Sequence, residues 1–135
     1  MDFNDFKILH SEVIMYCQLI ENDLKWIYSN MKEGNPEENF NSLSTNSLGN
    51  TISMLKNLDN SDRRPLLTSA DYNFLKQMKD KRNYWCHQAY IDFSYINDFT
   101  YSNEYKNVCS KLRKDHEKFK ALQNVLEQIK LKMYR

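Results

Sequence analysis

Glycine and proline are scarce in this sequence, with only two of each among its 135 residues. Turn-rich β folds need both residues at their tight turns, whereas long helices exclude them from their interiors, so the scarcity favours a helical protein. No apolar run is long enough to span a membrane, and the N-terminus has no basic segment followed by an apolar one. These absences predict a cytoplasmic protein without a membrane segment.

Cysteine and net charge are also low. The three cysteines, at positions 17, 86 and 109, are widely spaced and odd in number, which favours reduced thiols over a disulfide framework. The 19 Lys and Arg residues against 18 Asp and Glu residues leave a formal net charge of +1. No overall basic field would therefore attract nucleic acid, and any contact with RNA must come from a local patch. The length fits one domain, residues 1–135.

Apolar residues recur at three- and four-residue steps in separate segments, a pattern typical of amphipathic helices. Thr68 and Asp71 form a capping-box pattern at the start of one of them. Four amphipathic stripes are most simply buried against one another, so the predicted fold is all-α, an up-and-down four-helix bundle. The predicted helices cover residues 4–32, 47–58, 68 to 89 or 90, and 103–133.

The segments between these helices are interpreted as loops. Residues 34–43 and 59–67 carry Gly, Pro, Asn and Ser, which are typical of turns. Residues 91–102 are rich in Tyr, Phe, Asn and Asp. Because several of these are aromatic, we expect this third loop to pack down onto the protein.

The motif Arg-Asn-Tyr-Trp-Cys-His, at residues 82–87, lies near the end of the third predicted helix. Imidazole has an unperturbed pKa of about 6.5, so His87 can exchange protons near neutral pH. Arg82 offers a permanently charged planar fork to phosphate oxygens, and Asn83 can orient the imidazole or a substrate oxygen. RNA carries its own nucleophile, the 2′-hydroxyl, so these groups can cleave it without a metal or cofactor. Arg82, Asn83 and His87 are therefore the candidate catalytic residues.

Two further side chains are expected on the same polar face. Each helical residue turns by about 100°, so Lys79, Asn83 and His87 stack at four-residue steps. Tyr90 returns to this face if the helix continues beyond His87. We predict that Lys79 and Tyr90 bind substrate. Arg82 starts about 140° from His87, but its side chain is long enough to bend around.

The motif resembles the Arg-x(4–6)-His signature of HEPN domains, small all-α proteins that are often ribonucleases and carry it near the end of the third helix. The resemblance implies a HEPN-like homodimer that brings two motifs together. It also implies a metal-independent endoribonuclease of a toxin–antitoxin, abortive-infection or other phage-defence system. Arg82 and His87 would then be catalytic, and RNA the substrate. A cognate antitoxin or a nucleotidyltransferase is the partner that the resemblance implies.

One subgroup of this family, the HepT-like toxins, has a tyrosine two residues after the histidine, which its partner antitoxin modifies. Ala89 holds that position here and Tyr90 follows it, so the resemblance does not extend to the modified tyrosine. The alternative to an enzyme is a catalytically inactive HEPN-like module for protein–protein interaction or dimerisation, accessory to a nucleotidyltransferase.

The remaining reactive side chains have simpler interpretations. His10 and His116 are expected to be structural or surface histidines, and His10 with Cys17 supplies too few ligands for a metal site. Cys86 diverges by about 100° from His87, which argues against a thiol–imidazole pair. A local basic rim could bind RNA phosphates. The candidates for this rim are Arg63, Arg64, Lys76, Lys79 and Lys81.

Overall fold

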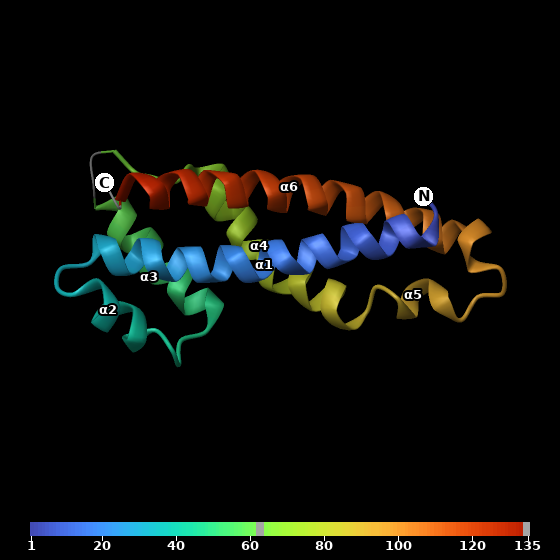
Figure 1. Cartoon of the computed structure of the whole chain (residues 1–135), viewed down its shortest axis with the longest axis horizontal. Helices are drawn as coiled ribbons and strands as arrows, with labels where there is room; N and C mark the ends of the chain where they lie inside the picture. Colours follow the sequence, from blue (N-terminus) through green and yellow to red (C-terminus); the bar gives the residue numbers. More distant parts are fainter. Residues whose placement is uncertain (62–63, 134–135) are drawn as a thin grey trace.

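The computed structural model describes residues 1–61 and 64–133, and these residues form helices with no strand among them (Figure 1). The all-α prediction is confirmed. The helices are α1 (Phe3–Met31), α2 (Pro36–Ser42), α3 (Leu48–Asn60), α4 (Ser69–His87), α5 (Ile91–Ser94), the 3₁₀ helix η1 (Phe99–Tyr101) and α6 (Asn103–Met133). Within the described ranges, no helix combines the length and apolarity needed to cross a membrane.

Side chains at the N-terminal ends of α1 and α4 cap these helices. The Asp2 carboxylate accepts the amide N–H of Asp5 at 2.8 Å before α1. Before α4, Thr68 and Asp71 form the predicted capping box, in which each side chain accepts a backbone N–H of the other residue. Such caps satisfy amide groups that have no partner within the helix, so they set where each helix begins.

The segment 34–43 is not a loop, because α2 occupies most of it. Asn35 caps this helix by accepting the amide N–H of Glu38 at 3.2 Å, and Pro36 stands at its first position, where a missing N–H costs nothing. The local pattern was therefore present in the sequence. Gly34 has a φ of +106°, a left-handed conformation that lets the chain reverse between α1 and α2.

The third predicted helix also ends earlier than expected, at His87 rather than at Ala89 or Tyr90. The amide groups of Gln88 and Ala89 both donate to the Tyr84 carbonyl, at 2.9 and 3.0 Å, which closes the helix with a turn. The aromatic segment 91–102 was predicted to be a loop, but α5 and η1 occupy much of it. It packs down only in part. Phe93 of α5 is fully buried, but Tyr95 and Tyr101 are 88% and 83% exposed.

The two longest helices, α1 and α6, lie side by side and run in the same direction (Figure 1). Glu12 contacts His116 at 2.6 Å, and Asp23 contacts Lys130 at 2.7 Å farther along both helices. In an up-and-down bundle of four helices the first and last are antiparallel, so that topology is wrong for this chain. The additional helix α2 supplies one more reversal, which brings α6 back parallel to α1.

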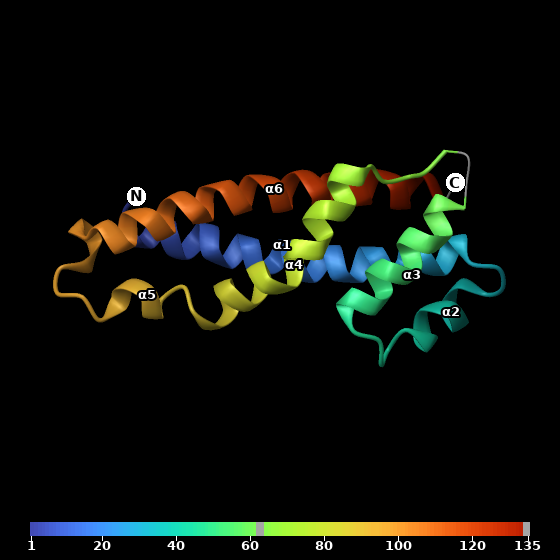
Figure 2. The same ribbon diagram turned by 180° about the vertical axis from the view of Figure 1, so that it is seen from behind.

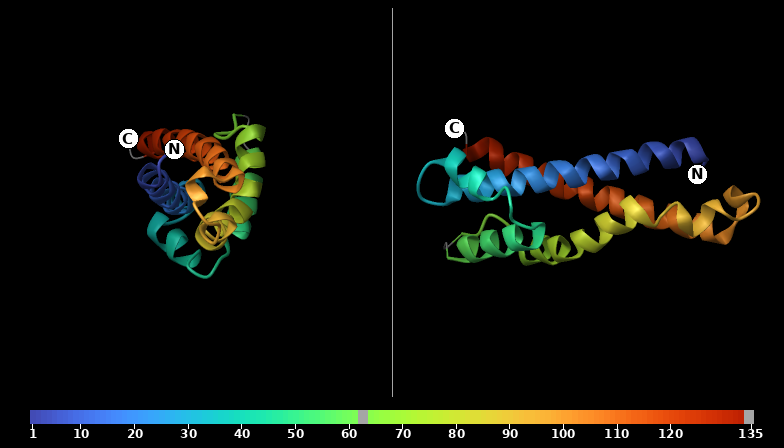
Figure 3. Two further views of the ribbon diagram at one scale, coloured as in Figure 1. Left: turned by 90° about the vertical axis from the view of Figure 1, so that its right-hand side faces the viewer. Right: turned by 90° about the horizontal axis from the view of Figure 1, so that it is seen from below.

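Helix α4 crosses the α1–α6 pair in the opposite direction (Figure 2), and the end-on view shows the three helices around a common centre (Figure 3). Large side chains from all three fill this core. They include Phe6 and Leu24 from α1, Met78 and Trp85 from α4, and Leu112 and Phe119 from α6, all at most 1% exposed. Burial of this apolar surface is the main force that holds the bundle together.

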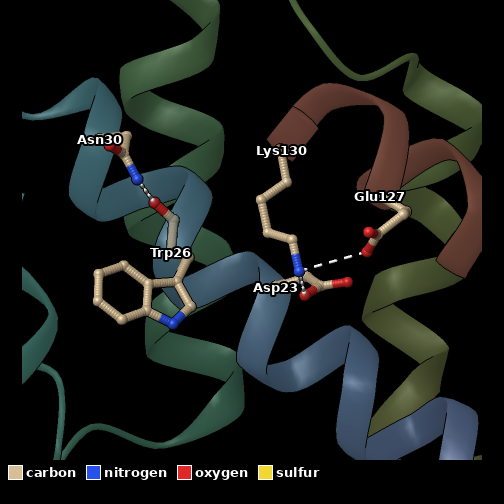
Figure 4. Close-up of polar contacts among 5 residues, drawn as sticks. All are labelled: Asp23, Trp26, Asn30, Glu127 and Lys130. Carbon is tan, nitrogen blue, oxygen red and sulfur yellow. Dashed lines mark hydrogen bonds and ion pairs between the residues drawn. The ribbon is translucent and has the colours of Figure 1, made fainter. Parts of the chain in front are cut away.

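The C-terminal parts of α1 and α6 are joined by a partly buried ion-pair cluster (Figure 4). Lys130 Nζ lies 2.7 Å from the buried Asp23 carboxylate and 3.3 Å from Glu127 on its own helix. The hydrogen bond to Asp23 raises the pKa of the Lys130 ammonium, so the group stays charged. A buried carboxylate needs such a partner, because leaving it unpaired costs several kcal/mol, about 3–5.

Candidate functional site

Buried contacts of Trp85 set the rotation of α4, and with it the directions of the motif residues. The indole N–H donates to Asp115 of α6 at 2.9 Å, and Lys81 Nζ donates to the other oxygen of this carboxylate at 2.9 Å. The Trp85 carbonyl accepts a hydrogen bond from His10 Nε2 of α1 at 2.7 Å. Trp85 therefore faces the core, and Arg82 and His87 are displaced from it around the helix.

Arg82 extends toward α1 and forms an ion pair with Glu21. The side chains of Arg82 and Glu21 are 30% and 29% exposed, so solvent reaches both partners. A partly exposed pair of this kind contributes only about 0–1 kcal/mol to stability. The guanidinium is thus held at the surface of the bundle, with donors that a competing anion can reach.

His87 is the last residue of α4, and its side chain is exposed, as is that of Asn83 one turn earlier. Neither side chain makes a hydrogen bond or ion pair to the part of the chain that the structure describes. Both are open to solvent or to a second molecule. The imidazole is therefore available for proton transfer, although no group of the same chain orients it.

Lys79 and Arg82 line one pocket with a volume of about 340 Å³. Its walls come from α1, from α4 and from the first turn of α3. His87, Asn83 and Tyr90 do not line this pocket. Within one chain, the structure therefore brings together two of the five predicted site residues, and these two are both cations.

Tyr90 is not aligned with His87, because α4 ends before it. Its hydroxyl donates to Nδ1 of His10 at 3.2 Å, and its ring packs edge-on against Phe6, with centroids 5.5 Å apart. Burial raises the pKa of the Tyr90 phenol. The predicted polar face that included Tyr90 is wrong, since the phenol turns toward α1.

The other two histidines have the structural roles expected of them. The Trp85 carbonyl can only accept a hydrogen bond, so His10 carries a proton on Nε2 and its Nδ1 accepts from Tyr90. His116 lies 2.6 Å from Glu12 and packs edge-on against Tyr16. These contacts join α1 to α4 and to α6.

Two of the three cysteines are buried in the core and do not reach this site. Burial raises the pKa of the Cys17 thiol to about 12, which keeps it protonated. Cys109 is buried as well, whereas Cys86 is exposed beside His87. Among the described residues, no group of three His, Cys, Asp or Glu side chains is placed to hold a metal ion.

The predicted basic rim is only partly assembled. Lys81 is directed to Asp115 and joins two helices, so it is not part of a surface patch. Lys76 is exposed and lines a neighbouring pocket with Lys79. Arg63 lies outside the described residues.

Sequence reasoning missed the other residues that line the pocket with Lys79 and Arg82. Glu21 and Lys25 come from the first predicted helix, and Gly49 and the buried Thr51 come from the second. Ser47 was correctly predicted to stand at the start of that helix. It was the one pocket residue whose position followed from the local sequence. Nothing in the separate periodicities indicated that these faces would meet.

Comparison with protein-family models, with curated proteins and with solved structures gives no match to this chain. The chain's own residues supply an accessible imidazole at the end of α4 and a cationic pocket one to two turns earlier on the same helix.

Proposed function

We propose that this protein is a metal-independent endoribonuclease with a HEPN-like fold that acts in a toxin–antitoxin or phage-defence system. The observation that carries the proposal is the presentation of Arg82 and His87 by one helix, both reachable from solvent. A permanent cation and a group that can accept and donate a proton are the two functions that RNA cleavage by its own 2′-hydroxyl requires.

The site is proposed to be completed by a second copy of the chain. Arg82 and His87 start about 140° apart on their helix, so one chain presents them in different directions. A two-fold axis near the end of α4 would bring two imidazoles and two guanidiniums to one phosphodiester. One chain then supplies a base and its symmetry mate an acid.

In the proposed reaction, one His87 removes the proton of the 2′-hydroxyl, and the 2′-oxygen attacks the adjacent phosphorus. The bond from phosphorus to the 5′-oxygen breaks, and the second His87 protonates that oxygen. Arg82 stabilises the charge that builds up on the phosphate oxygens, and Asn83 orients a substrate oxygen. The products are a 2′,3′-cyclic phosphate and a 5′-hydroxyl. Positioned acid–base groups typically contribute about 10²–10⁴-fold to such a step.

The ion pair between Arg82 and Glu21 is the observation that favours the non-catalytic alternative, an interaction module accessory to a nucleotidyltransferase. The pair is partly exposed to solvent and contributes only about 0–1 kcal/mol. A phosphate can therefore compete with Glu21 for the guanidinium.

The test is cleavage of RNA in EDTA by the purified protein and by its His87→Ala variant. The expected result is cleavage with cyclic-phosphate ends by the parent chain, and at least about 100-fold slower cleavage by the variant. Cys86→Ala is the matched control, since Cys86 is an exposed neighbour without an assigned role. Equal rates for the parent and His87→Ala, or inertness of both, would refute the proposal and favour the interaction module.

A further inference from the structure

The pocket that holds Lys79 and Arg82 has an excess of positive charge. Its charged lining residues are Lys25, Lys79, Arg82 and Glu21, so three cations and one carboxylate leave two positive charges. They come from α1 and α4, while the third wall is the first turn of α3. A recess with this balance attracts a doubly charged anion.

The first turn of α3 adds backbone donors to this pocket. Ser47 uses its hydroxyl to accept the N–H of Asn50, at 3.1 Å, and its carbonyl to accept the N–H of Thr51, at 3.1 Å. The amide groups of Leu48 and Gly49 have no recorded acceptor among the described residues. Gly49 also leaves open space, since a Cβ placed there would meet only the Ser47 hydroxyl at 4.0 Å. The partial positive charge of a helix N-terminus favours anions at such a position.

Thr51 provides an independent indication of a ligand. This residue lines the same pocket and is 1% exposed, yet its hydroxyl has no hydrogen-bond partner in the described structure. A threonine inside a helix commonly bonds to the carbonyl four residues earlier, and Thr51 does not. Native proteins rarely bury a hydroxyl unpaired, so this side chain is explained by a group that occupies the pocket.

We propose that this pocket binds a phosphate monoester. The terminal phosphate of a nucleotide is the chemical type that fits the pocket. A monoester carries about −1.5 to −2 charges at neutral pH, which matches the two positive charges, whereas a diester carries only one. The volume of about 340 Å³ is within the range of small-molecule sites, about 300–1,000 Å³, and exceeds what a bare phosphate needs. The inference concerns binding alone and does not depend on RNA cleavage, since His87 is not part of the pocket.

The test is an NMR titration of the folded chain at constant ionic strength with inorganic phosphate, with AMP and with cyclic AMP. AMP and cyclic AMP share the same base and sugar, but AMP carries a phosphate monoester whereas cyclic AMP carries a phosphate diester. Saturable shifts of the Gly49 and Thr51 amide signals are expected with AMP, with about tenfold weaker binding of cyclic AMP. No saturable shift, or equal affinity for the two nucleotides, would overturn the proposal. Saturation by inorganic phosphate as tight as by AMP would support the phosphate site and show that the nucleoside adds nothing.

Two variants from different helices probe the site without touching Arg82. Lys25→Gln should weaken AMP binding about tenfold, while Lys120→Gln, the same charge change at an exposed position of α6, should leave it unchanged. Thr51→Val keeps the shape but removes the hydroxyl. It should raise the melting temperature of the free protein and weaken AMP binding severalfold. An unchanged affinity in both Lys25→Gln and Thr51→Val would refute the site.

The same titration of His87→Ala separates this proposal from the ribonuclease. AMP binding by that variant with loss of RNA cleavage supports both proposals. RNA cleavage by a parent chain that fails to bind AMP overturns the pocket alone, and AMP binding by an inert parent chain overturns the ribonuclease alone.

Discussion

The indole N–H of Trp85 lies 2.9 Å from the buried carboxylate of Asp115, and this hydrogen bond connects α4 to α6 beside the motif. Lys81 neutralises the same carboxylate from one turn earlier. Because Trp85 is three residues after Arg82 and two before His87, its burial determines where both of them point. The candidate site thus depends on a core residue that takes no part in its chemistry.

Replacing Trp85 with Phe should destabilise the fold strongly. Asp115 is 4% exposed and would lose one donor, and the smaller ring would leave a cavity in the core. We expect a loss of about 2–4 kcal/mol in the free energy of unfolding, measured by urea denaturation. Tyr84→Phe is the control, since its hydroxyl donates to the exposed Asp92 and should matter by less than about 1 kcal/mol. A Trp85→Phe variant as stable as the control would contradict this role.

Glu21→Gln should release Arg82 without harming the fold. The pair is partly exposed, so we expect the free energy of unfolding to change by less than about 1 kcal/mol. Under the proposed function, the freed guanidinium should bind RNA phosphate better, so the rate of RNA cleavage at low substrate concentration should rise severalfold. Lower activity in a stable Glu21→Gln protein would show that the carboxylate itself contributes to the site.

Asp59 should be important for the connection between α3 and α4. Its fully buried carboxylate accepts the amide groups of Leu66 and Leu67, at 2.7 and 3.1 Å, and the hydroxyl of Tyr72, at 2.6 Å. Asp59→Asn loses the charge that strengthens these bonds and replaces one acceptor oxygen with an NH2 group, which then faces the backbone N–H of Leu66 or of Leu67. A loss of about 2–4 kcal/mol in the free energy of unfolding is expected. Tyr72→Phe, which removes one of the three bonds, should cost less, and the reverse order would refute this assignment.

Stability should fall in mild alkali because of Cys17. Burial raises the pKa of its thiol from 9.0 to about 12, so the unfolded chain loses this proton at a lower pH than the folded chain. The contribution is therefore fully present below pH 9 and is lost as the pH rises toward 12. The free energy of unfolding should decline as the pH rises from about 9 toward 12. A Cys17→Ala variant should decline less steeply over that range, and an identical slope would exclude Cys17 as the cause.

Much of the fold could be predicted from local patterns. The apolar periodicities located four helices, and Thr68 with Asp71 marked the first turn of α4 because capping depends only on residues three apart. Asn35 with Pro36 carried an equally local signal for α2, which was overlooked because the segment has few apolar residues. Tyr90 was misplaced because the end of α4 depends on tertiary packing of Ala89 and Phe93 as well as on helix propensity.

The amino-acid sequence by itself determined the helical class, most helix limits and the spacing of Arg82 and His87, since these follow from propensity and from about 3.6 residues per turn. The tertiary structure alone decided that α1 and α6 run parallel, that Glu21 pairs with Arg82 across 61 positions, and that Lys25, Thr51 and Lys79 line one pocket. The physical reason is that a periodic pattern indicates only which side of each helix is apolar. The polar faces that meet are selected only when the apolar sides of several helices pack together.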